Sequence, residues 1–139
     1  MNYAVAYYTR SGNTKKVADA IAEVIGVPTT DISKGLSADV DVLFLGSSLY
    51  AFTYDPSVEK FIQANASKIK KIVSFSTSAS GNSTAKFVKA AAEANGIEFY
   101  PQAFKCRGKF GFMNAKHPND KDLDEARDFA KTVLSKLGE

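Results

Sequence analysis

The chain has 139 residues, 45% of them hydrophobic, and its 18 Lys and Arg residues against 15 Asp and Glu give a net charge of +3. This length suffices for a two-faced sheet with covering helices, so we expect residues 1–139 to form a single domain. The lone Cys106 excludes a disulfide framework and a cysteine-rich metal site. Because no apolar run approaches membrane-spanning length and the start lacks a basic leader pattern, we predict a cytoplasmic protein without membrane spans.

Apolar runs alternate with amphipathic segments along the chain. The strand-like runs are Tyr3 to Tyr8, Val27 to Ile32, Val40 to Leu45, Ile72 to Phe75 and Ile97 to Phe104. The helical patterns cover Thr14 to Ile25, Pro56 to Ala64, Thr84 to Ala94 and Asp120 to Leu137. This alternation predicts an α/β fold, a five-stranded parallel sheet with helices on both faces. For such a sheet we expect the strand order 2-1-3-4-5 and a ligand at the carboxyl ends of strands one, three and four.

A turn rich in hydroxyls joins the first strand to the first helix. It consists of Thr9, Arg10, Ser11, Gly12, Asn13 and Thr14. A helix start of this composition offers backbone N–H groups, the positive end of the helix dipole and short O–H donors to one anion. Walker and dinucleotide-binding glycine motifs do not occur in the sequence. The turn is therefore a candidate phosphate loop, with an ordinary N-capped turn as the alternative.

The pattern T-x-S-G-x-T after the first strand resembles that of flavodoxins, whose corresponding loop holds the phosphate of FMN. Two further polar loops, at residues 46–56 and 76–83, follow the third and fourth strands at family-like spacings. The resemblance covers nearly the whole chain and places it with the short-chain flavodoxins or their flavodoxin-like relatives. It implies a flavodoxin-like fold with FMN as the cofactor.

The resemblance also assigns roles within the candidate phosphate loop. Thr9, Ser11 and Thr14 are expected to supply hydroxyls to the phosphate, and Gly12 and Asn13 their backbone amides. Arg10 occupies the variable position of the loop, where a solvated charge is the alternative to a phosphate contact.

The two later loops are expected to hold the flavin ring. In the first, the implied contacts are Ser48, Leu49, Tyr50, Ala51 and Phe52. We expect Tyr50 to stack on the ring, with Phe52 and Tyr54 as further candidates and packing against the next helix as the alternative. In the second, the implied contacts to the flavin edge are Ser76, Thr77, Ser78, Ser80, Gly81 and Asn82. The alternative is a polar turn that caps the next helix through Asn82 or Ser83.

Two features depart from the family pattern. Electron-carrying flavodoxins are usually strongly acidic, whereas this chain is net basic, so its docking partners are expected to differ. The second ring loop also has no aromatic residue where many relatives stack one on the flavin, which leaves one ring face open.

The segment from Cys106 to Asn119 is long and basic for a connection between a strand and a helix. Its cations suit an acidic partner. We predict no nucleic-acid binding, because the basic residues are few and the following helix is acidic. His117 is the only histidine, which excludes a histidine cluster for a metal, and we expect it to be an ordinary loop residue.

These observations predict an FMN-binding electron carrier that works between a reductase and an acceptor protein, as a monomer and without catalytic residues of its own. One alternative is a small flavin-dependent oxidoreductase that reduces a quinone or a similar acceptor. Another is a flavin-free binding module on the same fold. A response-regulator receiver fits worse, because that class needs an acidic pair after the first strand and this loop has none.

Overall fold

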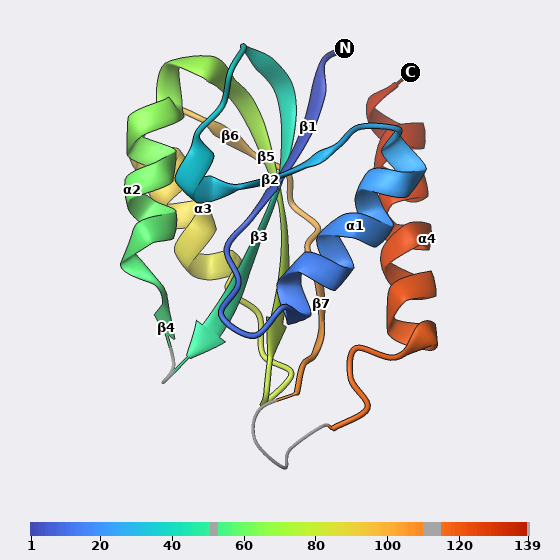
Figure 1. Cartoon of the computed structure of the whole chain (residues 1–139). Helices are drawn as coiled ribbons and strands as arrows, with labels where there is room; N and C mark the ends of the chain where they lie inside the picture. Colours follow the sequence, from blue (N-terminus) through green and yellow to red (C-terminus); the bar gives the residue numbers. More distant parts are fainter. Residues whose placement is uncertain (51–52, 110–114, 139) are drawn as a thin grey trace.

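The computed structural model describes residues 1–50, 53–109 and 115–138. A central sheet separates two pairs of helices (Figure 1). The helices α2 (Pro56–Asn65) and α3 (Ala85–Ala94) cover one face, and α1 (Asn13–Ile25) and α4 (Asp120–Leu137) cover the other. The predicted α/β class with helices on both faces is confirmed, and the predicted helix bounds differ from the observed ones by one residue at most.

The parallel strands run in the order β2-β1-β3-β5, and β6 and β7 share the next position because both pair with β5. Their bounds are β1 Tyr3–Tyr7, β2 Thr29–Asp31, β3 Val40–Tyr50, β5 Ile69–Ser78, β6 Glu98–Phe99 and β7 Phe104–Arg107. Counted by position, this is the expected order 2-1-3-4-5. Short 3-10 helices at Ile32–Lys34 and Ala66–Lys68 precede β3 and β5.

The fifth position corrects one prediction, because the run from Ile97 to Phe104 is not one strand. Phe99 pairs with Ile72 and Phe104 pairs with Phe75, so the chain holds two more residues than β5 between these pairs. Pro101 lies in this break and has no N–H to donate to a ladder. The extra residues divide the strand into β6 and β7.

The third and fourth predicted strands are also longer than expected. β3 continues through Tyr50 and β5 through Ser78, so residues predicted as loops form strand ends. A short strand, β4 (Thr53–Tyr54), then turns back antiparallel to the end of β3. The polar residues do not end the strands because most of their buried hydroxyls find partners across the sheet or on the helices.

The core lies in two layers, one on each face of the sheet. Alternation along β3 divides its side chains between them, with Leu43 and Leu45 toward α2 and α3, and Val42 and Phe44 toward α1 and α4. Each fully buried side chain of this size stabilises the fold by about 1.5 to 3 kcal/mol relative to an exposed one. The two layers hold the sheet rigidly between the helices.

The carboxyl ends of β1, β3, β5 and β7 reach the same edge of the molecule, where α1 and α4 begin (Figure 1). Both chain termini lie at the opposite edge. Within the described residues, no helix combines the length and the apolar character needed to cross a bilayer. The loops predicted to form a site are thus brought together at one edge.

Candidate cofactor site

The start of α1 is shaped by Gly12, whose φ of 90° places it in the left-handed region. Nothing lies within 4 Å of a Cβ built there, so the backbone conformation rather than space demands glycine. Among the described residues, no side chain caps this helix. The Gly12 N–H instead donates to Thr9 Oγ1 at 2.9 Å, which folds the turn over the helix start. The amides of the first turn have no acceptor within the helix and suit an anion.

Three buried hydroxyls from different elements meet at this helix start. Thr14 Oγ1 lies 2.6 Å from Ser48 Oγ and 2.9 Å from Thr77 Oγ1. The hydroxyls of Ser48 and Thr77 lie 3.4 Å apart. We call these three residues, from α1, β3 and β5, the hydroxyl cluster. Each hydroxyl can act as a donor and as an acceptor. A hydroxyl that now donates to another member of the cluster can therefore donate to an anion instead.

Gly46 lets α1 approach β3 this closely. A Cβ at this position would lie 2.3 Å from the Phe75 ring and 2.9 Å from the Thr14 methyl group. Both contacts are too short for real atoms, so only glycine fits between the helix start and the neighbouring strand. The close approach that assembles the hydroxyl cluster is therefore encoded at residue 46.

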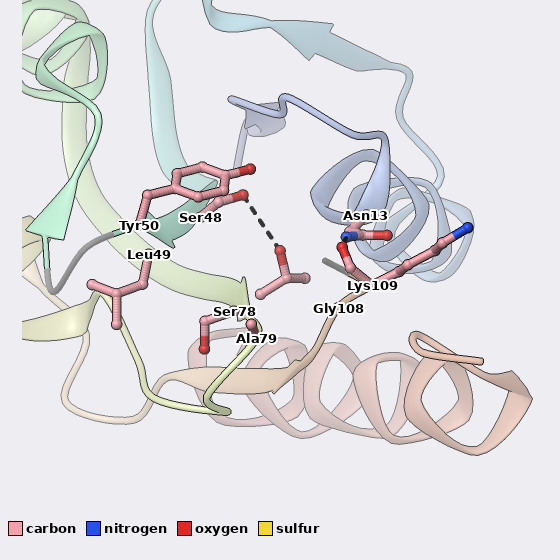
Figure 2. A pocket seen from close by; sticks show the side chains of 9 residues that line it. Asn13, Ser48, Leu49, Tyr50, Ser78, Ala79, Gly108 and Lys109 are labelled. Atoms are coloured by element: carbon pink, nitrogen blue, oxygen red, sulfur yellow. Dashed lines mark hydrogen bonds between the residues drawn. The ribbon is translucent and has the colours of Figure 1, made fainter. Parts of the chain in front are cut away.

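A pocket opens beside the hydroxyl cluster (Figure 2). Its lining residues are Asn13, Ser48, Leu49, Tyr50, Thr77, Ser78, Ala79, Gly108 and Lys109. Tyr50 and Leu49 stand on one side, and Asn13, Gly108 and Lys109 on the other. The Asn13 side-chain amide donates to the Lys109 carbonyl at 2.9 Å, which fastens the end of β7 to α1. A Cβ on Gly108 would lie 2.8 Å from that amide nitrogen, so a side chain there would displace the Asn13 amide from its present position.

Tyr50 is held from outside the pocket by a cation. The Arg10 guanidinium lies 4.4 Å from the centre of the Tyr50 ring. Arg10 also donates to Tyr8 Oη at 3.3 Å and lies 3.6 Å from Asp55 Oδ2, and the Tyr8 hydroxyl donates to the same carboxylate. A hydrogen bond from the Ser57 N–H, followed by those from side-chain hydroxyls and the Arg10 charge, lowers the pKa of Asp55. This network joins the candidate phosphate loop to the first ring loop.

The structure thus brings together the predicted residues Asn13, Thr14, Ser48, Leu49, Tyr50, Thr77 and Ser78. Ala51 and Phe52 lie outside the described residues. Tyr54 is buried and stacks on Phe87 of α3 at 5.4 Å between ring centres. The alternative of packing against the helices therefore holds for Tyr54, and Tyr50 is the described aromatic residue at the pocket.

Two residues of the phosphate loop, Thr9 and Ser11, do not line this pocket. Thr9 accepts from the Gly12 N–H, and Ser11 Oγ accepts from the Asn13 amide at 3.0 Å. Arg10 is neither a fully solvated charge nor turned toward the hydroxyl cluster, because it lies over Tyr50. The three side chains brace the loop in this structure.

The second ring loop divides between the site and the cap of α3. Ser76 is fully buried, and its hydroxyl accepts from the Thr84 N–H at 3.3 Å on the other face of the sheet. This correction follows from strand alternation, which sends Thr77 toward α1 and Ser76 toward α3. In the turn itself, Ser80 Oγ accepts from the Asn82 N–H, and Gly81 adopts φ of 81°. Ser83 Oγ accepts from the Ala85 N–H at 3.0 Å just before α3, although the N-cap residue of that helix is Thr84 and its own side chain makes no capping hydrogen bond.

Sequence reasoning missed Gly108, Lys109 and Ala79, which also line the pocket. The unusual length of the segment after β7 was the available signal for the first two. Two residues of the stretch from Cys106 to Asn119, Cys106 in β7 and His117 before α4, carry side chains that could take part in chemistry. Cys106 is buried, and this burial raises its pKa to about 12. His117 Nδ1 lies 2.6 Å from Asp122 Oδ2, so the ring braces the start of α4.

The described residues contain no group of three potential metal-ligating side chains. The described lining residues and the helix start beside them supply hydroxyls, helix amides, an aromatic ring and a lysine. This set suits a ligand with a phosphate at one end and a flat ring at the other.

The strand order defines a doubly wound α/β protein. Its pocket lies at the carboxyl ends of the strands, near the point where the strand order reverses. The model of the flavodoxin domain family matches residues 4–110. A relative, an uncharacterized protein of Methanocaldococcus jannaschii, is 30% identical over 137 residues, 88% of this chain and 90% of that protein. This chain therefore belongs to the flavodoxin family.

Solved structures agree with this assignment. A flavodoxin from the domain Archaea superposes with a TM-score of 0.80 at 21% identity, over 100% of each chain. The oxidised flavodoxin 1 of Bacillus cereus superposes with a TM-score of 0.73 at 18% identity, over 97% of this chain and 98% of that one. At these identities the likeness shows that the fold is shared.

Proposed function

We propose that this protein binds FMN at the pocket beside the hydroxyl cluster and transfers electrons between partner proteins. The observation that carries the proposal is the meeting of Thr14, Ser48 and Thr77 at a helix start without a side-chain cap. The helix amides and the three hydroxyls provide donors for a phosphate, and no neighbouring carboxylate lines the pocket among its described residues.

The ring end of the ligand is supported by the pocket walls. Tyr50 offers an aromatic face, and Leu49 adds apolar surface next to it. Ser78 and Ala79 form the adjoining wall. Gly108 keeps the far wall thin where it approaches Asn13. These features fit the mixed polarity of an isoalloxazine ring.

Bound FMN would supply the redox chemistry, because its ring takes up and releases electrons, whereas the protein supplies binding and electrostatics. The residues of the chain hold the phosphate, orient the ring and set the charge around it. Arg10, at the Tyr50 side of the pocket, contributes a positive charge close to the expected ring position. We include in the proposal that the protein acts as a monomer with a reductase and an acceptor protein.

The direct test is an absorbance titration of the ligand-free protein with FMN and with riboflavin. We expect saturation at one FMN per chain, a perturbed visible spectrum, and weaker binding of riboflavin because it lacks the phosphate. The absence of any FMN binding would favour a flavin-free binding module on this fold.

One observation favours a second candidate function, a small flavin oxidoreductase. Among the described residues, the walls that adjoin and face Tyr50 carry Ser78, Ala79, Asn13, Gly108 and Lys109 and no second aromatic residue, which leaves room for a small acceptor at one ring face. Repeated turnover of a quinone with NAD(P)H and the purified protein alone would support this enzyme. A requirement for a separate reductase would support the electron carrier.

A further inference from the structure

Exposed cations lie at the same edge of the molecule as the candidate cofactor pocket, where Lys109 lines the pocket and, with Lys16 and Lys116, also lines a neighbouring hollow. They come from the phosphate loop, the first turns of α1, the end of β7 and the segment before α4, all at the carboxyl edge of the sheet (Figure 1). We call them the cationic rim, which consists of Arg10, Lys16, Arg107, Lys109 and Lys116. The last three belong to the long basic segment and its strand, for which the fold itself gives no role.

Two positions of the rim are anchored, Arg107 through its side chain and Lys109 through its backbone. Arg107 donates to the Ala79 carbonyl at 3.1 Å and lies along Gly81, whose added Cβ would sit 3.5 Å from the arginine side chain. The Lys109 N–H donates to the His117 carbonyl at 2.9 Å, and its own carbonyl accepts from Asn13. Fixed positions reduce the entropy lost when a charged partner binds.

The carboxylates at this edge are engaged in internal contacts. The Asp55 side chain is 18% exposed and accepts from Tyr8 and from the Ser57 N–H. The Asp122 side chain is 14% exposed and binds His117 and the Asn119 N–H. Asp120, at the start of α4, is the exposed carboxylate nearest this segment in the chain. The solvent-facing charge of the edge is therefore mainly positive.

Ion pairing leaves most of the rim available. Arg10 is shared with Asp55. Among residues 1–50, 53–109 and 115–138, Lys16, Arg107, Lys109 and Lys116 form no ion pair. By contrast, Lys15 on the same helix turn is neutralised by Asp19 at 2.8 Å. The rim thus presents charges that the protein itself does not compensate.

We propose that the cationic rim is the docking surface for an acidic electron-transfer protein. Docking there would place the partner over the pocket mouth, which is where an electron has to pass. This inference rests on the proposed function. The cations come from four separate segments around the site and Lys109 lines the pocket itself, which favours a compact acidic protein that faces the pocket over a nucleic-acid backbone.

The test uses two double variants with equal change in net charge. In Lys16→Glu/Lys116→Glu, the rim is altered at two residues that do not line the cofactor pocket. In Lys131→Glu/Lys136→Glu, the same charge change falls on exposed positions in the second half of α4. The probes are a purified acidic [2Fe–2S] ferredoxin and, as the opposite charge control, basic cytochrome c. Affinity is measured by titration calorimetry and association rates by stopped flow, at low and moderate salt.

We expect the rim variant to lose about tenfold or more in association rate and affinity for the ferredoxin at low salt, because the attraction that steers encounter is removed. The α4 variant should change by less than about threefold, and cytochrome c should bind neither wild type nor control. Equal losses in both variants, or no loss in the rim variant, would overturn the proposal.

Two further arms separate the alternatives. Tighter binding of a single-stranded DNA oligonucleotide than of the ferredoxin, with loss in the rim variant, would overturn the proposal in favour of nucleic acid. Calorimetric binding of the ferredoxin does not require flavin. Failure of the FMN titration together with rim-dependent ferredoxin binding would therefore reject the proposed cofactor and keep the docking surface.

Discussion

Thr14 Oγ1 lies 2.6 Å from Ser48 Oγ, which joins the first turn of α1 to the carboxyl end of β3. Both side chains are almost fully buried, so the contact forms in a region of low dielectric where hydrogen bonds are strong. An anion that enters this region meets donors already in place. The packing that assembles the sheet edge is thus also what prepares the candidate phosphate site.

The close approach at Gly46 gives the first prediction. Gly46→Ala would press its methyl group against the Phe75 ring and the Thr14 methyl, at 2.3 and 2.9 Å. We expect a loss of about 1 to 3 kcal/mol in the free energy of unfolding, as for overpacked cores, together with weaker FMN binding. Urea denaturation and an FMN titration measure the two effects.

A matched control for Gly46 is Gly96→Ala. This glycine has open space around it but a φ of 71°, so alanine costs backbone strain of about 1 kcal/mol without touching the site. Its FMN affinity should stay within twofold of wild type. An FMN affinity that falls equally in both variants would show that general destabilisation, not the helix start, controls binding.

Tyr50 carries the second prediction. Tyr50→Leu should weaken FMN by about two- to tenfold, since aromatic pairs contribute about 0.5 to 1.5 kcal/mol beyond buried area. Tyr50→Phe keeps the ring and should bind FMN nearly as wild type does. The visible spectrum of bound FMN reports the ring contact directly. Identical spectra for wild type and the leucine variant would exclude stacking by Tyr50.

Asp55 gives a prediction about pH. Its carboxylate caps α2 through the Ser57 N–H, and its pKa is lowered in the folded protein. A lowered folded pKa means that the stabilisation is complete above the unfolded value of about 3.9 and is lost as the pH falls through the folded value. Asp55→Ala should cost about 1 kcal/mol at pH 7, and less at pH 3.

Denaturation curves between pH 7 and pH 3 measure this effect. Asp55→Asn is the control, because asparagine keeps the capping oxygen but carries no charge. It should lie near wild type at pH 7 and show a flatter dependence on acid. A wild-type protein whose acid sensitivity is unchanged by both substitutions would refute the role assigned to this carboxylate.

Cys106 supplies a chemical prediction. Burial raises its pKa to about 12, so the reactive thiolate is scarce at pH 8. Iodoacetamide should label the folded protein far more slowly than the same protein in 6 M urea. Comparable labelling rates in the two conditions would contradict the burial of this side chain.

Much of the fold was predictable from the sequence, because continuous apolar strands and 3.6-residue periodicity report burial directly. The helix ends followed from local chemistry such as Asp55-Pro56 and Asn119. The break at Pro101 and the extension of β5 through Ser78 could not be predicted from the sequence, because they depend on pairing across the sheet. Serine and threonine are read as loop residues, yet here they are buried in strands.

The candidate site likewise contains residues that local sequence predicts and residues whose roles depend on the folded structure. The phosphate-loop pattern identified Thr14 from local sequence alone. The direction of Ser76, away from the pocket, depends on strand alternation that begins several residues earlier. The contacts of Arg10 with Tyr50 and of Asn13 with Lys109 join residues 40 or more positions apart. Such pairs have no local signature.

The central claim is tested most directly by the ratio of riboflavin to FMN dissociation constants in three proteins. These are the wild type, Ser48→Ala and Ser47→Ala. The adjacent serines are both buried, but Ser48 contacts Thr14 whereas Ser47 contacts Thr84 on the other face of the sheet at 2.6 Å. A hydrogen bond to a charged group is worth about 1.5 to 3 kcal/mol, so Ser48→Ala should reduce the ratio about tenfold to a hundredfold. Ser47→Ala should leave the ratio unchanged, and equal ratios in all three proteins would contradict a phosphate site at the hydroxyl cluster.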